Sequence, residues 1–141
     1  MNCIRPWLWI GDYHDSSNRA ALAAHGIGTL LHLVANVRHP AVVTVYLPVK
    51  DAALLAADRL EAGIAAVHEA HERGEKLLIA CGAGISRSAT FATAALWAIE
   101  GLPLRDAFAA VKAAHPQALP HPALWESLCR YTGEDVTLEF L

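Results

Sequence analysis

The stretch Lys76–Thr90, KLLIACGAGISRSAT, decides how this sequence is interpreted. Its first five residues form a short apolar run, which predicts a buried strand. A segment with two glycines follows. Residues 87–101, RSATFATAALWAIEG, then predict a helix that is apolar almost all round, as is typical of a helix at the centre of a domain. We therefore expect a strand, a loop and a buried helix in succession.

The loop between this strand and this helix is placed where anions bind. Ligands of open α/β sheets lie at the carboxyl ends of the strands, and helix N-termini attract anions through free backbone N–H groups and the helix dipole. Gly82 and Gly84 allow the backbone to curl with its N–H groups pointing inward. Arg87 can add a bidentate contact to two phosphate oxygens. Residues 81–87 therefore predict a phosphate site.

The chemistry of such a site follows from a cysteine and a serine at its two ends. Cys81 would lie at the floor of the loop, where the backbone dipoles and Arg87 favour the thiolate. A thiolate directed at phosphorus is a nucleophile for phosphoester cleavage. Ser88 can hydrogen-bond the sulfur and help it to leave in the second step.

The leaving oxygen also needs a proton, which an upstream carboxylic acid can supply. The candidate is Asp51 in LPVKDAALLAAD, because it follows a predicted strand and could reach across the mouth of the site. Asp12, Asp15 and Asp58 are rivals. We interpret the first two as turn and cap residues and Asp58 as an exposed helix residue.

The rest of the chain predicts alternating strands and helices. Strands are expected at 7–10, 29–34, 41–49 and 76–80, and helices at 16–26, 54–73, 87–101, 104–115 and 121–133. This order predicts an α/β fold with a central, mostly parallel sheet of about four to five strands flanked by helices. The 141 residues are expected to form a single domain, 1–141.

Composition narrows the class of protein. The net charge is −3 and no run of lysine or arginine occurs, which argues against a nucleic-acid partner. The longest apolar stretch, around Ala89 to Ile99, is too short to span a membrane, and we see no signal peptide. Cys3, Cys81 and Cys129 are a poor disulfide framework. We expect a cytoplasmic monomer that needs no metal or cofactor.

Two further features of the sequence each allow another hypothesis, a metal site and a disulfide. His68 and His71 lie on one predicted helix and could form half of a metal site, although a solvated helix face is the simpler interpretation. Cys3 could form a reversible disulfide with Cys81 under oxidation, which only their proximity in the fold would support.

The loop resembles the active-site loop of the cysteine-based protein tyrosine phosphatases. CGAGISRS is similar to that family's Cys-x5-Arg-Ser/Thr motif, and AGISRSAT to its dual-specificity branch. LWIGDYHDSSNRAALAAHGIGTLLHLV resembles the family's opening strand, helix and second strand, YLPVKD resembles the segment that ends in the general acid, and the small size resembles the compact atypical members. The resemblance covers nearly the whole chain.

This resemblance implies the family's fold and a role for each residue that matches its motif. Cys81 would be the nucleophile, Arg87 would bind phosphate, Asp51 would act as acid and base, and Ser88 would assist the second step. The residues implied to enclose the phosphate are Gly82, Ala83, Gly84, Ile85, Ser86 and Arg87. No metal is implied.

The sequence departs from the family at two places. Ala80 stands where the family nearly always has a histidine that braces the loop, and alanine has no polar atom to do this. We expect this difference to affect the rate of the reaction. In HPQALPHPALW, His115 and His121 stand where relatives often carry a basic residue and an asparagine.

Three hypotheses follow. The first is a metal-independent dual-specificity phosphatase whose partner is a phosphorylated protein or peptide bearing phosphotyrosine, phosphoserine or phosphothreonine. The second is a phosphatase of a non-protein substrate, which ranks lower because GAGIS has no lysine and Ala89 follows Ser88. The third is a pseudophosphatase that binds phosphorylated partners with little turnover, for which Ala80 is the only support.

Overall fold

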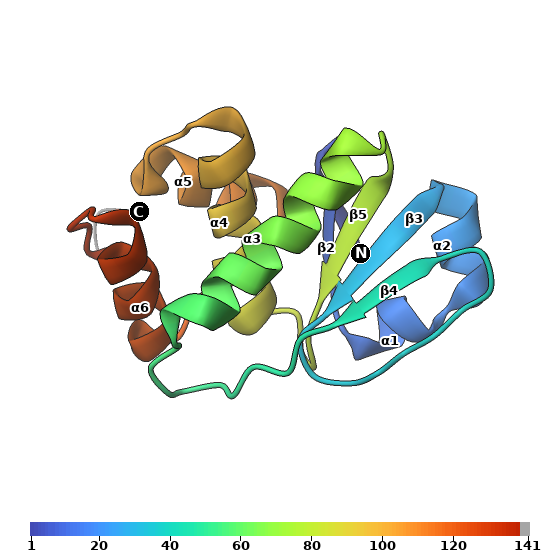
Figure 1. Ribbon diagram of the computed structural model, residues 1–141, viewed down its shortest axis with the longest axis horizontal. Coiled ribbons are helices and arrows are strands. Elements are labelled where there is room, and N and C mark those ends of the chain that lie inside the picture. The colour runs from blue at the N-terminus through green and yellow to red at the C-terminus, as the bar shows by residue number, and fades with distance from the viewer. Residues whose placement is uncertain (139–141) are drawn as a thin grey trace.

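The computed structural model describes residues 1–138, and a five-stranded sheet forms the centre of that part of the chain (Figure 1). The strands lie in the order β1-β2-β5-β3-β4. The last four are mutually parallel, and β1 is an antiparallel edge strand beside β2. Their bounds are β1 (Asn2–Arg5), β2 (Leu8–Gly11), β3 (Ile27–His32), β4 (Val43–Tyr46) and β5 (Lys76–Ala80). The predicted α/β fold with a mostly parallel sheet is confirmed.

Helices cover both faces of this sheet. Figure 1 shows α3 to α6 grouped together and away from α1 and α2. The bounds of the helices are α1 (Tyr13–Ser17), α2 (Arg19–His25), α3 (Ala57–Glu72), α4 (Arg87–Glu100), α5 (Leu104–Ala114) and α6 (Pro122–Thr132). Within residues 1–138, no helix is both long enough and apolar enough to cross a membrane.

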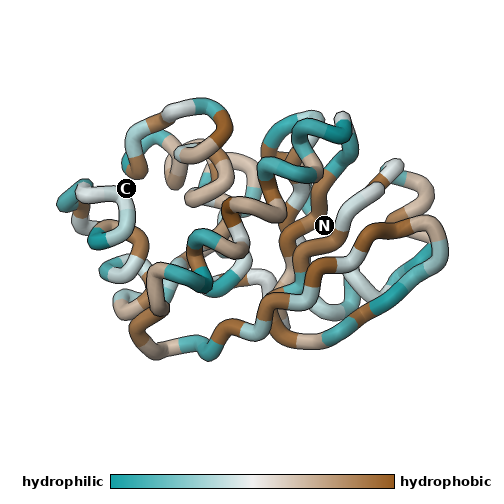
Figure 2. The backbone as a smooth tube through the Cα atoms, in the orientation of Figure 1, coloured by the Kyte–Doolittle hydropathy of each residue, from teal (hydrophilic) through white to brown (hydrophobic). Residues whose placement is uncertain are grey.

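The side chains of β5 show how the two faces are filled. Leu77 and Ile79 belong to the larger core, which the sheet shares with α3 to α6, whereas Leu78 and Ala80 belong to a smaller core with Leu22 of α2. This alternation is the two-residue period of a strand. Because both faces are covered, the strand is apolar throughout, and Figure 2 shows the central strands as largely apolar segments. The position after Ala80 is thereby fixed at the carboxyl edge of the central strand.

Helix α4 is the buried helix that the sequence predicts. All nine residues from Ser88 to Leu96 are buried. Helix α3 crosses it so closely that a Cβ atom at Gly63 would collide with the ring of Phe91. This close packing holds the N-terminus of α4, and with it Arg87, in a fixed place at the end of β5.

The predicted elements differ from the structure in several details. The strand expected at 41–49 is limited to Val43–Tyr46, and the strand expected at 29–34 is Ile27–His32. The helix expected at 16–26 is divided into α1 and α2, because Asn18 leaves the helical conformation and caps α2 by accepting the Ala21 N–H. The helix expected from residue 54 begins at Ala57. Strand β1 was not predicted, since NCIR places only Ile4 in the core and shows no clear apolar alternation.

Candidate active site

The sulfur of Cys81 lies in the loop that joins β5 to α4. The residue follows β5 directly and is only 2% exposed. Its Sγ lies 3.2 Å from Oγ of Ser88, in the first turn of α4, and accepts the backbone N–H of Gly84 at 3.3 Å. The structure therefore brings Cys81 and Ser88 into direct contact at the floor of the loop.

The carbonyl groups of this loop are held from the outside by donors of other segments. Leu119, before α6, donates its backbone N–H to Ile85 O at 2.9 Å. Tyr13 donates its backbone N–H to Gly82 O at 3.1 Å. Nε2 of His115 lies 2.6 Å from Gly84 O, which it hydrogen-bonds.

These outward carbonyls determine where the N–H groups of the loop point. All peptide bonds of residues 1–138 are trans, and in a trans peptide the C=O and the following N–H point in opposite directions. The N–H groups that share peptide planes with the three held carbonyls belong to Ala83, Ile85 and Ser86. They are therefore directed to the inner side of the loop, which gives the loop the form of an anion-binding nest.

The two glycines of the loop differ in backbone conformation and in what surrounds them. Gly84 has φ +70°, a conformation that L side chains rarely adopt, and a Cβ there would lie 3.1 Å from the backbone of Gly11. Gly82 does not have a positive φ. A Cβ at Gly82 would lie 3.4 Å from Nη2 of Arg87. The curl expected from both glycines therefore depends on Gly84, whereas a Cβ at Gly82 would only reach ordinary contact with the guanidinium.

Arg87, the first residue of α4, connects the loop to the segment that carries Asp51. Its Nη1 donates to the carbonyl of Val49 at 3.1 Å. Its Nε is buried and has no hydrogen-bond partner among residues 1–138. One edge of the guanidinium is thus anchored on the chain after β4.

Asp51 is exposed and lies at the rim of the loop, in the segment between β4 and α3. Its Oδ1 accepts a hydrogen bond from Oγ of Ser86 at 2.8 Å and from the N–H of Ala52 at 3.0 Å. Ser86 Oγ in turn accepts the backbone N–H of His121 at 2.9 Å. Ser86 therefore joins the start of α6 to Asp51, and the carboxylate predicted far upstream lies against the loop.

His32, at the carboxyl end of β3, lies beside Ala80 in the sheet register and is fully buried. Its Nδ1 accepts the backbone N–H groups of Val34 and Ala35, and its Nε2 lies 3.0 Å from Oγ of Ser16. Burial, assisted by the positive charge of Arg87, lowers the pKa of the imidazole. The ring is therefore held neutral. Sequence reasoning missed this residue; its signal is a histidine inside the otherwise apolar run TLLHLV.

His115 and His121 were noticed in the sequence, but their roles were not predicted. His115 is 3% exposed and connects Gly84 O to the amide of Asn2, whose Nδ2 lies 2.7 Å from Nδ1 of the ring. His121 caps α6 by accepting the Ala123 N–H. The loop between α5 and α6 thus supports residues 81–87, the expected phosphate loop, from one side.

The rival acids and the remaining thiols lie in other environments. Asp12 and Asp15 form a capping box at the start of α1, and Asp58 lies exposed in the first turn of α3. Cys3 is exposed and its Sγ donates to the carbonyl of Arg5, whereas Cys81 is buried. The three cysteines of the chain are free thiols.

The helix face of His68 and His71 does not assemble a metal site. The ring of His71 packs edge-on against Trp7 with 4.9 Å between centroids, and His68 is exposed. Residues 1–138 contain no group of three or more histidine, cysteine or acidic side chains that could hold a metal ion.

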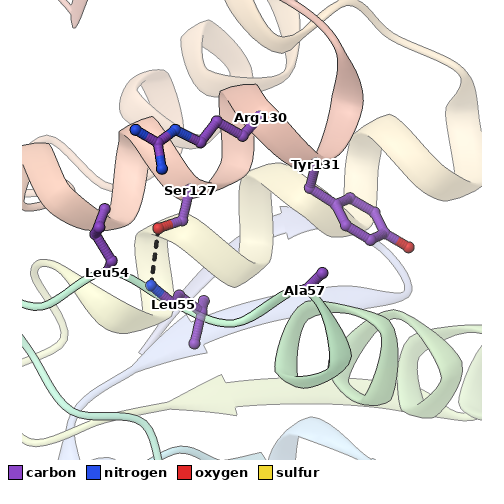
Figure 3. Close-up of a pocket in the computed structure, with 6 residues that line it drawn as sticks. All are labelled: Leu54, Leu55, Ala57, Ser127, Arg130 and Tyr131. Carbon is purple, nitrogen blue, oxygen red and sulfur yellow. Dashed lines mark hydrogen bonds between the residues drawn. The ribbon is translucent and has the colours of Figure 1, made fainter.

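Two pockets are lined by residues of α6 and of the segment between β4 and α3. One has a volume of about 290 Å³ and adjoins the candidate site, because it shares Asp51 and Ser86 with it; Leu119, Pro120, His121, Pro122 and Leu138 complete the lining. The other, of about 220 Å³, lies between the segment before α3 and α6 (Figure 3). None of its lining residues belongs to the phosphate loop.

Comparisons with known proteins agree with this geometry. A family model described as "Dual specificity phosphatase, catalytic domain" matches residues 8–134. Human dual specificity phosphatase 28 is 34% identical over 134 residues, which cover 91% of this chain and 75% of that protein. Zebrafish (Danio rerio) dual specificity protein phosphatase 22-B is 29% identical over 143 residues, which cover 95% of this chain and 75% of that protein.

A solved structure extends the agreement to three dimensions. The crystal structure of human DUSP28 matches with a TM-score of 0.88 at 31% identity, covering 94% of this chain and 96% of that chain. The expected resemblance is therefore confirmed both in sequence and in fold. The chain belongs to the dual specificity phosphatase family, and its relatives there are the compact atypical members.

Proposed function

We propose that this chain hydrolyses phosphomonoesters through a cysteinyl-phosphate intermediate on Cys81. The observation that carries the proposal is the position of its sulfur, at the floor of a loop whose N–H groups point inward and whose rim holds both Arg87 and Asp51. Family membership supports a protein phosphatase hydrolase as the general class.

In the first step, the Cys81 thiolate attacks phosphorus, an S–P bond forms, and the bond from phosphorus to the ester oxygen breaks. Asp51, protonated at the start, gives its proton to that leaving oxygen. The negative charge on the phosphoryl oxygens is stabilised by the inward N–H groups of the loop and by Arg87. The buried Nε–H of Arg87, which has no partner among residues 1–138, supports this assignment.

In the second step, water attacks the phosphorus of the cysteinyl phosphate while the carboxylate of Asp51 takes one of its protons. The S–P bond breaks, inorganic phosphate leaves, and the thiolate of Cys81 is restored. The Ser88 hydroxyl, 3.2 Å from the sulfur, can donate a hydrogen bond to the leaving thiolate. The two steps together consume one phosphomonoester and one water molecule, and no other co-reactant is needed.

We further propose phosphotyrosine, phosphoserine and phosphothreonine of a protein or peptide as substrates. The surface beside the loop is apolar: Ile85 is 40% exposed and Leu119 is 57% exposed. Such a rim, beside a loop whose GAGIS segment has no lysine, fits a polypeptide better than a polyanionic lipid or RNA. The proposed working form is a cytoplasmic monomer, and the three free thiols fit a reducing compartment.

The test is release of p-nitrophenol from p-nitrophenyl phosphate, measured with a chelator over pH 5 to 8. We expect turnover by the parent protein, loss of it in Cys81→Ser, and a flattened basic limb of the pH–rate profile in Asp51→Asn. Turnover that survives in Cys81→Ser would contradict the cysteine mechanism. A parent protein that retains a phosphotyrosine peptide without hydrolysing it would instead support the pseudophosphatase hypothesis suggested by Ala80.

A further inference from the structure

We propose that His115 is a positioning residue that orients the peptide between Gly84 and Ile85, so that the Ile85 N–H faces the bound phosphate. Asn2, on β1, holds the imidazole in the tautomer that does this. The inference deepens the proposed function and relies on it only where turnover is the readout.

The proton of His115 can be placed from its two partners. The amide nitrogen of Asn2 can only donate, so Nδ1 of His115, at 2.7 Å, must accept. The carbonyl of Gly84 can only accept, so Nε2, at 2.6 Å, must carry the hydrogen. A neutral imidazole protonated on Nε2 satisfies both contacts. The ring is 3% exposed, so water does not replace either partner readily.

Gly84 is the residue of the loop that most needs such a restraint. Its own N–H donates to Cys81 Sγ, on the inner side of the loop. Its carbonyl accepts a hydrogen bond from His115, on the outer side. Glycine has access to more backbone conformations than other residues. Without the bond to its carbonyl, the peptide between Gly84 and Ile85 can rotate, and the Ile85 N–H then leaves the inner side of the loop.

His115 is also the single side chain that holds one of the three outward carbonyls described above. Tyr13 and Leu119 hold the carbonyls of Gly82 and Ile85 through backbone N–H groups. A substitution at His115 therefore removes one restraint and leaves the other two in place.

The contacts of His115 and Asn2 can replace the support that a polar side chain at position 80 would give the loop. Ala80 is buried in the smaller core, and its side chain has no polar atom that could hydrogen-bond the loop. His115 approaches from the end of α5 and Asn2 from the edge strand β1, so the loop is braced from outside the sheet. We infer that this brace supports the rate that Ala80 would otherwise reduce.

The test uses four variants of the full chain. His115→Leu removes both hydrogen bonds. His115→Gln restores a donor and an acceptor at about the positions of the two ring nitrogens. Asn2→Ala removes only the group that fixes the tautomer. Ser127→Ala is the control, because its part-buried hydroxyl accepts the Leu55 N–H (Figure 3) and donates to Ala123 O, both at 2.8 Å, and bonds to no residue of the loop.

Two quantities are measured for each variant: the dissociation constant for tungstate, by calorimetry, and kcat and KM for p-nitrophenyl phosphate. The loss of one oriented donor to a reacting oxygen costs about 100-fold to 1,000-fold in rate in other enzymes. We expect His115→Leu to weaken tungstate binding and to lower kcat/KM by about 10-fold to 100-fold, His115→Gln to recover most of both, and Asn2→Ala to lie between. Ser127→Ala should lower the melting temperature alone.

Turnover by the parent protein tests the proposed function, whereas the tungstate affinities of the variants test the role of His115. A parent protein without turnover would defeat the proposed function, and the tungstate comparison would still test His115. Equal tungstate affinity in His115→Leu and the parent would overturn the inference. If His115→Leu does not fold, the decision passes to Asn2→Ala: unchanged tungstate affinity and unchanged kcat/KM there would overturn the inference, and a loss in both would support it.

Discussion

Ser86 donates its hydroxyl hydrogen to Asp51 at 2.8 Å, and the same oxygen accepts the backbone N–H of His121. The hydroxyl therefore has a fixed direction: the His121 N–H occupies one of its two lone pairs, and its hydrogen points to the carboxylate. A residue of the phosphate loop thus positions the proposed acid, which lies 35 residues earlier in the chain.

Replacing Ser86 with alanine should therefore impair proton transfer more than phosphate binding. We expect Ser86→Ala to lower kcat by about 10-fold for an alkyl phosphate, a part of the usual 100-fold to 10,000-fold effect of general acid catalysis. The loss should be smaller for p-nitrophenyl phosphate, because p-nitrophenolate leaves with little help from an acid. Ser17→Ala, which removes an exposed hydroxyl bonded to Tyr13 O, is the control. Equal losses for both substrates would contradict a role in positioning the acid.

Gly84 should not tolerate alanine, for two separable reasons. The positive φ alone costs about 1–2 kcal/mol for an L residue, and the new Cβ would also press on the backbone of Gly11. Gly101→Ala is a matched control, because Gly101 has φ +68° and open space around its Cβ position. We expect both variants to lose about 1–2 kcal/mol or more in urea denaturation, but only Gly84→Ala to lose tungstate binding. Full tungstate affinity in Gly84→Ala would show that the close approach to Gly11 is unimportant.

Much of the fold could be predicted because the local signals agree with the tertiary structure. The apolar run of β5 and the apolar helix α4 each indicate their elements without help from distant residues. Strand β1 has only Ile4 as a core residue, so its pairing with β2 depends on a tertiary contact that no local pattern reveals.

Some residues of the candidate site could likewise be predicted from the sequence, and others could not. Cys81, Arg87 and Ser88 lie within one short motif, and Asp51 follows a recognisable strand, so these residues could be named from the sequence. The partners that hold the loop could not: His115 meets Gly84 across 31 positions and Asn2 across 113 positions. Such contacts arise from how the end of α5 and the edge strand β1 pack, which spacing in the sequence does not encode.

Cys129, in α6, should be the less reactive of the two cysteines outside the loop. Burial raises the pKa of its thiol, and the nearby acidic side chains of Asp135 and Glu134 add to this. Cys3 is exposed. Because the thiolate is the reactive form, we expect iodoacetamide at pH 7.5 to label Cys3 faster than Cys129, as measured by peptide mass spectrometry. Cys129→Ser should retain the parent's phosphatase rate. Faster labelling of Cys129 would contradict the effect expected from its partly buried environment.

His32 should make the stability of the protein depend on pH below neutrality. Burial and the charge of Arg87 lower the pKa of the folded imidazole below its ordinary value of 6.5. Between that lowered pKa and 6.5, the unfolded chain binds more protons at this residue than the folded chain does, so stability rises with pH. The contribution of His32 is thus present above pH 6.5 and is lost as the pH falls through that range.

Substitution by asparagine isolates this contribution, because an amide oxygen can accept the backbone N–H groups that Nδ1 accepts but cannot take up a proton. We expect His32→Asn to unfold in urea with a smaller difference in free energy between pH 7.5 and pH 5.0 than the parent shows. The control is His68→Asn, which removes an exposed imidazole from α3 and should leave that difference unchanged. An undiminished pH dependence in His32→Asn would mean that another group causes it, and that the buried ring beside Ala80 accepts a proton without cost to the fold.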